Sequence, residues 1–244
     1  MICCLHFILK LLNLPHQISN YLFNFLIQLI INLNFILMKL TFKHQDSYSR
    51  GQLLLRTFFG FLYIIIPHYF LLMFIMFWGG ILSFISWWAV LFTAKYPKGM
   101  FNYQVNMRKW TIRVSARLYN MADGYPSFGL KGTDGNTNIE VPYPATLSRG
   151  LLLLRFFFGF IYVYIPHGFC LFFRGIATCF LSFLAWWAIL FTGKYPKSWF
   201  DFNVGTIRWL MRVDLYMSWM DDKYPKFSGK EFEEELTNLA PAQM

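Results

Sequence analysis

Two long apolar segments dominate the chain, and a shorter basic segment follows each of them. The first apolar segment, residues 53–94, contains only Arg56 and His68 as charged or histidine side chains, and the second, residues 151–193, contains three such residues. A membrane-spanning helix needs about 20 predominantly apolar residues, and each segment offers roughly twice that length. The pattern therefore predicts an all-α integral membrane protein.

The apolar segments belong to a repeated unit. A shift of 99 residues, which moves Pro67 onto Pro166, aligns the two halves without a gap. The recurring motifs are Ser-Arg-Gly at 49–51 and 148–150, Pro-His at 67–68 and 166–167, Trp-Trp-Ala at 87–89 and 186–188, Lys-Tyr-Pro-Lys at 95–98 and 194–197, and Tyr-Pro-x-Phe at 125–128 and 224–227. We therefore expect two tandem copies, residues 39–129 (the first copy) and residues 139–228 (the second copy).

Three segments lie outside the copies. Residues 130–138 are rich in Gly, Asn and Thr and predict a linker, and residues 229–244 form an acidic tail. Residues 1–38 have no counterpart in the second copy and contain an apolar run diluted by Asn and Gln. Two interpretations remain open for them: an extra helix or signal-anchor, or a misassigned start upstream of a natural start at Met38.

Each copy is expected to contain three kinds of element. A short alternating stretch, residues 40–42 and 139–141, predicts a strand-like lead-in. Arg174-Gly175 interrupts the second apolar segment, and a charge at mid-membrane is costly, so we expect a transmembrane helical hairpin that turns there, with arms at 151–173 and 176–192. The alternative gives each copy one interfacial helix and one span.

Charge placement favours the hairpin. Both Lys-Tyr-Pro-Lys segments and the basic segments after them should face the cytoplasm under the positive-inside rule. Two copies that face the same way need an even number of crossings each. A single crossing per copy would leave one basic end outside.

The segment after each Lys-Tyr-Pro-Lys motif predicts an amphipathic interfacial helix, because apolar and basic residues recur at steps of three and four. Such a helix lies at the membrane surface with its cations near phosphate groups. The other interpretation is a basic face that packs on the protein's own loops. The candidates for membrane-surface or partner contact are Lys109, Trp110, Arg113, Arg208, Trp209 and Arg212.

Four residues inside the apolar segments are candidate polar or ligand-binding residues: His68, His167, Arg56 and Arg155. A histidine inside a membrane could bind a headgroup or relay protons. It could instead serve the adjacent proline, by bonding the backbone carbonyl that the proline leaves free. The two arginines could extend to the interface or contact an anion.

Composition narrows the function classes. Hydrophobic residues make up 57% of the chain and charged residues 14%, against about a quarter charged in soluble domains. The net charge of +10 comes from cations beside apolar segments, which fits contact with membrane lipids rather than nucleic acid. No catalytic, metal-binding or cofactor-binding motif occurs, so we expect no enzyme, metal or cofactor.

The motifs in their fixed order resemble a known family. Arg-x5-Arg, Pro-His, Leu-Phe-Thr-x-Lys-Tyr-Pro, Arg/Lys-Trp-x-x-Arg and Tyr-Pro-x-Phe resemble the bacterial membrane family catalogued as domain of unknown function 4389, over residues 39–228. That family commonly ends its unit with Tyr-Pro-Pro-Phe, from which Ser127 and Lys226 depart. The resemblance implies a bacterial membrane protein without an established activity.

Two functions remain open at this point, and an enzyme stays as a third alternative. The leading expectation is a non-catalytic scaffold or interaction subunit, multi-pass in the bacterial inner membrane, with membrane lipids or another membrane protein as partner. The alternative is a transport or lipid-handling subunit with a polar path lined by the paired His and Arg residues.

Overall fold

The computed structural model describes residues 38–231, so both interpretations of residues 1–37 and the tail from residue 232 lie outside the described part. This part is mostly helical, with one small pair of strands. The first copy contains β1 (Lys39–Phe42), α3 (Arg50–Gly60), the π-helical η1 (Phe61–Ile65), α4 (Ile66–Thr93) and α5 (Lys98–Leu118). The second contains β2 (Thr137–Glu140), α6 (Arg149–Gly159), the π-helical η2 (Phe160–Tyr164), α7 (Ile165–Thr192) and α8 (Lys197–Met217). Each helix of the second copy has the bounds of its counterpart shifted by 99 residues.

Each apolar segment forms one uninterrupted helical path. The paths Arg50–Thr93 and Arg149–Thr192 have 44 residues each and are long and apolar enough to cross a membrane. The predicted turn at Arg174-Gly175 is wrong, because α7 continues through both residues. The Arg174 guanidinium is held by α8: its Nε donates to Thr206 Oγ1 at 2.9 Å and its Nη2 to the Phe202 carbonyl at 3.1 Å.

The two strand-like lead-ins are confirmed, and they pair with each other. β1 and β2 are antiparallel, and Leu40 lies opposite Ile139. These two residues are equivalent positions of the two copies, since they also differ by 99. Equivalent residues that face each other indicate a two-fold relation. An approximate two-fold axis that relates the copies therefore passes beside this pair.

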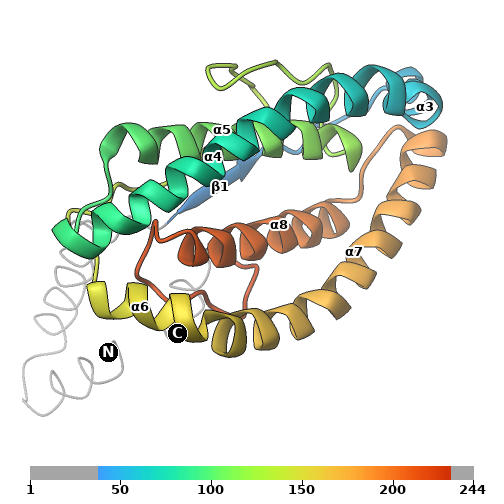
Figure 1. Cartoon of the computed structure of the whole chain (residues 1–244). Helices are drawn as coiled ribbons and strands as arrows, with labels where there is room; N and C mark the ends of the chain where they lie inside the picture. Colours follow the sequence, from blue (N-terminus) through green and yellow to red (C-terminus); the bar gives the residue numbers. More distant parts are fainter. Residues whose placement is uncertain (1–37, 232–244) are drawn as a thin grey trace, which may run out of the picture. The chain divides into compact units, whose positions relative to one another are not determined.

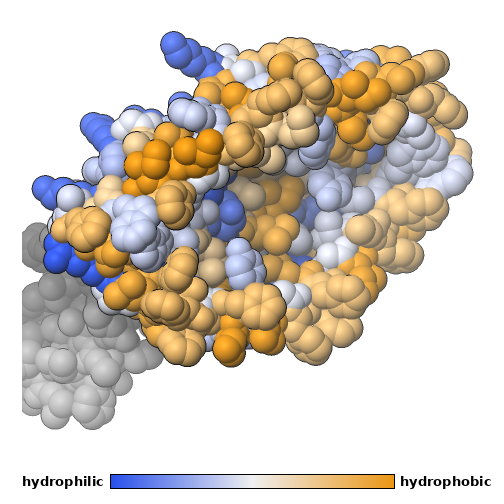
Figure 2. All heavy atoms as spheres, viewed as in Figure 1, coloured by the Kyte–Doolittle hydropathy of each residue, from blue (hydrophilic) through white to orange (hydrophobic). Residues whose placement is uncertain are grey.

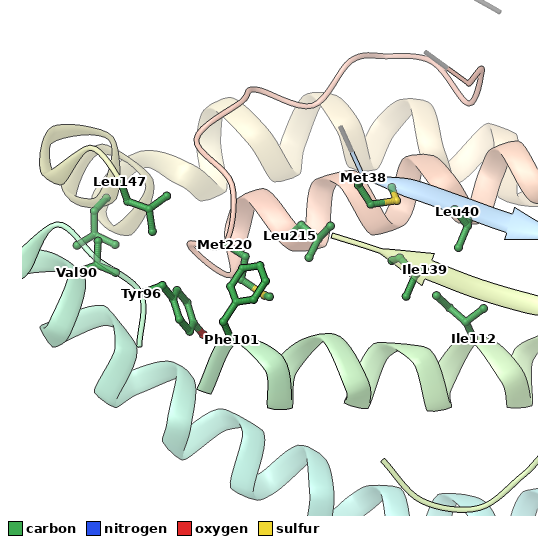
Figure 3. Packing of buried hydrophobic residues seen from close by; sticks show 11 residues of the cluster. Met38, Leu40, Val90, Tyr96, Phe101, Ile112, Ile139, Leu147, Leu215 and Met220 are labelled. Atoms are coloured by element: carbon green, nitrogen blue, oxygen red, sulfur yellow. The ribbon is translucent and has the colours of Figure 1, made fainter. Parts of the chain in front are cut away.

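The apolar face of the strand pair packs on α5 and α8, which are called the central helices below. Leu40 and Ile139 are buried and lie near Ile112 of α5 and Leu215 of α8 (Figure 3). The alternating side chains point the other way, as strand geometry requires, and are exposed. These polar, outward-facing residues are Lys39, Thr41, Asn138 and Glu140.

The two long helical paths run antiparallel and meet at both ends, around α5 and α8 (Figure 1). At each junction the start of one path bonds the last carbonyls of the other, which have no partner within their own helix. The bonds are Tyr48 N to Gly193 O at 2.8 Å, Arg50 Nη2 to Phe191 O at 2.9 Å, Leu147 N to Ala94 O at 2.8 Å and Arg149 Nη2 to Phe92 O at 2.8 Å. The ends of α4 and α7, and with them the two Lys-Tyr-Pro-Lys segments, consequently lie at opposite ends of this arrangement.

Candidate functional site

The histidine of each copy lies in a closed aromatic pocket. His68, one residue after Pro67, has no exposed surface. The Trp110 indole Nε1 donates to its Nδ1 at 2.9 Å, and the Phe128 ring stacks on the imidazole with centroids 4.0 Å apart. Helix α4 supplies the histidine, α5 the tryptophan, and the loop after α5 the phenylalanine.

The second copy has the same pocket. Trp209 Nε1 donates to His167 Nδ1 at 2.9 Å, and the Phe227 ring stacks on His167 at 3.9 Å. Each histidine is thus enclosed by aromatic side chains of its own copy, rather than facing the other histidine.

The proline beside each histidine leaves a carbonyl free, and a tyrosine binds it. Proline has no N–H, so the carbonyl four residues before Pro67, that of Tyr63, lacks a helical donor. The Tyr125 hydroxyl donates to this carbonyl at 2.9 Å, and the Tyr224 hydroxyl donates likewise to the Tyr162 carbonyl at 2.9 Å. One of the two interpretations open from the sequence gave this role to the imidazole, but a tyrosine hydroxyl fills it in both copies. The imidazole Nδ1 is already taken by the tryptophan.

Hydrogen bonding fixes what each imidazole can do. Because Nδ1 of His68 accepts a hydrogen bond, the neutral ring carries its proton on Nε2. Nε2 of His68 and of His167 has no hydrogen-bond partner within residues 38–231. A protonated Nε2 can donate a hydrogen bond, but it offers no lone pair to a metal or haem iron. The chemistry left to each ring is that of a neutral donor.

Arg56 and Arg155 are buried and ion-paired. Arg56 Nη2 lies 3.1 Å from Asp123 Oδ1, and Arg155 pairs in the same way with Asp222. The second carboxylate oxygen of Asp123 accepts the Ser49 backbone N–H at 2.7 Å, at the start of α3. Each arginine therefore binds a loop carboxylate of its own copy.

One arginine of α5 and its equivalent on α8 bind loops of the protein. Arg113 donates to the Gly129 and Gly132 carbonyls at 2.6 and 2.7 Å, and Arg212 donates to the Ser228 and Lys230 carbonyls at 3.1 and 2.8 Å. Four residues of the set expected at a membrane surface or partner are buried within the protein: Trp110, Arg113, Arg208 and Trp209. Lys109 is half-buried. The alternative interpretation, packing on the protein's own loops, describes these side chains better.

Burial and charge shift the pKa values of this network. Burial lowers the pKa of Arg113. Burial alone would raise the pKa of Asp134, but hydrogen bonds from Arg117 and Thr137 outweigh it and hold that pKa below its usual value. Arg117 and Asp134 form a buried ion pair at 2.5 Å, which ties the linker to α5.

Comparison with family models singles out the second copy. Residues 151–229 match the family described as Domain of unknown function (DUF4389). The match supports the family resemblance seen in the sequence for one copy only, since it does not extend to residues 39–129. No curated protein and no solved structure matches the chain.

Within the DUF4389 segment, the structure shows roles that the sequence did not indicate. Tyr224 and Phe227 of the Tyr-Pro-x-Phe motif hold the π-helical segment and the histidine, and Asp222 just before them holds Arg155. The recurrence of this motif in both copies was the available signal. Its partners could not be named, because they lie about 60 residues earlier in the chain.

Proposed function

We propose that this chain is a non-catalytic scaffold of the bacterial inner membrane whose two long helices lie in the lipid of the cytoplasmic leaflet. Membrane lipid is its first partner under this proposal, and another membrane protein is the second. The observation that carries the proposal is that the two long helices expose mainly large apolar side chains.

The exposed surface of the long helices is apolar. Between Gly51 and Phe92 no charged side chain is exposed, whereas large apolar ones are, among them Phe58 at 73% and Phe77 at 72%. In the most apolar 18 residues of each path, only 22% (first path) and 17% (second path) are buried inside the protein. Figure 2 shows apolar residues along these helices on one face of the molecule. Soluble proteins rarely expose apolar surface on this scale, so lipid is the environment that fits it.

The two-fold relation bears on how the helices lie. If the antiparallel paths crossed the membrane, the axis would lie in its mid-plane, and the exposed Lys39 and Glu140 beside that axis would sit at mid-depth. Charges at that depth cost several kcal/mol. If the paths lie flat, the axis follows the membrane normal and the polar strand face meets the cytoplasm. Both Lys-Tyr-Pro-Lys segments are then on one side, as the positive-inside rule favours.

The internal contacts favour a scaffold over a transport subunit. Arg56 and Arg155 are ion-paired within their own copies, and each histidine is enclosed by aromatic rings. These residues therefore form four separate internal contacts rather than the lining of one transport pathway. Asp123, Asp134 and Asp222 pair with arginines, which leaves none of these carboxylates for acid–base chemistry.

Charge placed on the apolar surface tests the proposal. Phe70 and Phe169 are equivalent residues, exposed at 60% and 67%. Changing both to Asp should release most of the full chain from membranes in a carbonate wash, because an Asp in the membrane costs about 2.5–3.5 kcal/mol. Asn138→Asp, on the polar strand face, is the matched control and should stay bound. Full retention of the Phe70→Asp/Phe169→Asp variant would mean that lipid does not cover this surface.

A further inference from the structure

A basic cavity of about 700 Å³ opens between β1, the first half of α8 and residues 227–231. This volume is in the range of small-molecule sites. Two carboxylates, Asp201 and Glu231, line it together with a larger set of cations. The cations are Lys39, Arg174, Lys197, Arg208 and Lys230. Cations therefore outnumber carboxylates in the lining by three.

Two arginines converge at Gly229. Arg208 Nη1 donates to the Gly229 carbonyl at 2.7 Å. A Cβ atom on Gly229 would lie 2.8 Å from Arg174 Nη2 and 2.5 Å from the Gly205 carbonyl oxygen. Only glycine at this position lets the loop lie against α8 with both guanidinium groups beside it. Residues from α7, α8 and the C-terminal loop thus build one site.

Neither guanidinium is fully neutralised within the described residues. Arg174 has no carboxylate in salt-bridge range there and bonds only the neutral oxygens of Thr206 and Phe202. Arg208 is 9% exposed, its Nε has no partner in the same part of the chain, and Glu231 lies 3.7 Å from its Nη2. Arg174 is half-buried and Arg208 is buried. Cations that are partly removed from water and incompletely neutralised favour an anion that enters this cavity.

The fold itself does not require this site, since the first copy lacks it. Ile75 takes the place of Arg174, and Met107 takes the place of Thr206. Met107 packs there against Gly79, where a Cβ atom would lie 2.9 Å from its sulfur. At these two positions the helix pair therefore carries apolar side chains in one copy and an arginine–threonine hydrogen bond in the other.

We propose that the cavity binds a phosphate group, either on the headgroup of an acidic phospholipid or as a free phosphate ion. Arginine presents paired N–H donors that match phosphate oxygens, and the lysines at the rim add attraction for the anion. This binding role goes beyond the scaffold function and does not depend on how the long helices lie in the membrane.

Calorimetric titration of the full chain in neutral detergent tests the proposal. The probes are dihexanoyl phosphatidic acid, inorganic phosphate and, as a zwitterionic comparison, dihexanoyl phosphatidylcholine. Arg174→Ile introduces the residue of the first copy and should weaken binding of the acidic probe at least tenfold. Lys194→Ile removes a charge from an exposed lysine that does not line the cavity, and should leave binding unchanged.

Further variants make each outcome decisive. Arg208→Lys keeps the charge but loses the paired donors, and should weaken binding several-fold even if Arg174→Ile does not fold.

Because three more carboxylates follow Glu231 in the sequence, the titration is repeated with Glu233, Glu234 and Glu235 changed to Gln. Binding of both probes supports a phosphate site, and binding of phosphatidic acid alone supports a headgroup site. No binding in the wild type and in the Gln variant, or equal binding in the folded Arg174→Ile and Arg208→Lys variants, overturns the proposal.

Discussion

At the scale of single residues, Arg113 of α5 and Arg212 of α8 are bound by carbonyl oxygens of the protein's own loops. The sequence showed the basic stripe of α5 through its spacing, and this stripe exists. The sequence could not show that this stripe faces a loop of the protein, because the acceptors of Arg113 are loop carbonyls 16 and 19 residues away. The spacing of residues along a helix shows which of them share a face, but it does not show which other segment packs on that face.

The Arg117–Asp134 pair gives a pH dependence. The pKa of Asp134 is lowered in the folded protein, so its stabilising contribution is complete above the unfolded value of about 3.9 and is lost as pH falls through the folded value. Asp134→Asn should lower the free energy of unfolding at pH 7 by about 3–5 kcal/mol and reduce the further loss below pH about 4. Denaturation in detergent micelles at several pH values measures both effects. Asp201→Asn, at an exposed pair with Lys197, should change little, and an equal effect there would contradict the assignment.

The tryptophan–histidine hydrogen bond should show as coupling between the two residues. In a double-mutant cycle of Trp110→Phe and His68→Phe, we expect a coupling energy of about 1 kcal/mol, since each single change leaves a buried polar group without its partner. Trp209→Phe with His167→Phe should give a similar value in the second copy. Coupling near zero in both cycles would show that the rings only fill space.

At the scale of elements, the strands and basic helices could be predicted from periodicity, but the turn at Arg174 could not be excluded. The argument for that turn assumed that a charge within an apolar segment must reach water. Arg174 lines a cavity beside α8 and is bound by Thr206, 32 residues later and on another helix, without any turn in α7. This contact with α8 explains why α7 has no turn at Arg174.

The Tyr-Pro-x-Phe motif and the π-helical segment should be linked energetically. Tyr125→Phe removes one hydrogen bond and should lower the free energy of unfolding by about 0.5–1.5 kcal/mol. In a Pro67→Ala background the new backbone N–H is available to the Tyr63 carbonyl, so the same change should cost less. Tyr69→Phe, whose hydroxyl has no hydrogen bond within the described residues, is the control. An equal loss in both backgrounds would show that the tyrosine hydroxyl does not replace the missing proline donor.

At the scale of the whole molecule, the decisive feature is the exchange of contacts between the copies. The repeat was visible in the sequence, but the pairing of β1 with β2 and the closure of each long path on the other depend on contacts up to about 150 residues apart. The two-fold relation that results places the Lys-Tyr-Pro-Lys segments at opposite ends. Crossing helices would therefore put these segments on opposite sides of the membrane, whereas flat helices put them on the same side.

Single-cysteine labelling at these two ends tests the central claim most directly. Gly99 and Ser198 are equivalent, exposed positions, and a Cβ at Gly99 meets no other atom. Each is changed to Cys in a full chain from which Cys3, Cys4, Cys170 and Cys179 have been removed, and a membrane-impermeant maleimide is applied to spheroplasts and to lysed cells. A scaffold in the cytoplasmic leaflet predicts that both cysteines are protected in spheroplasts and labelled after lysis. Labelling of one cysteine but not the other in spheroplasts would contradict it and show that the long helices cross the membrane.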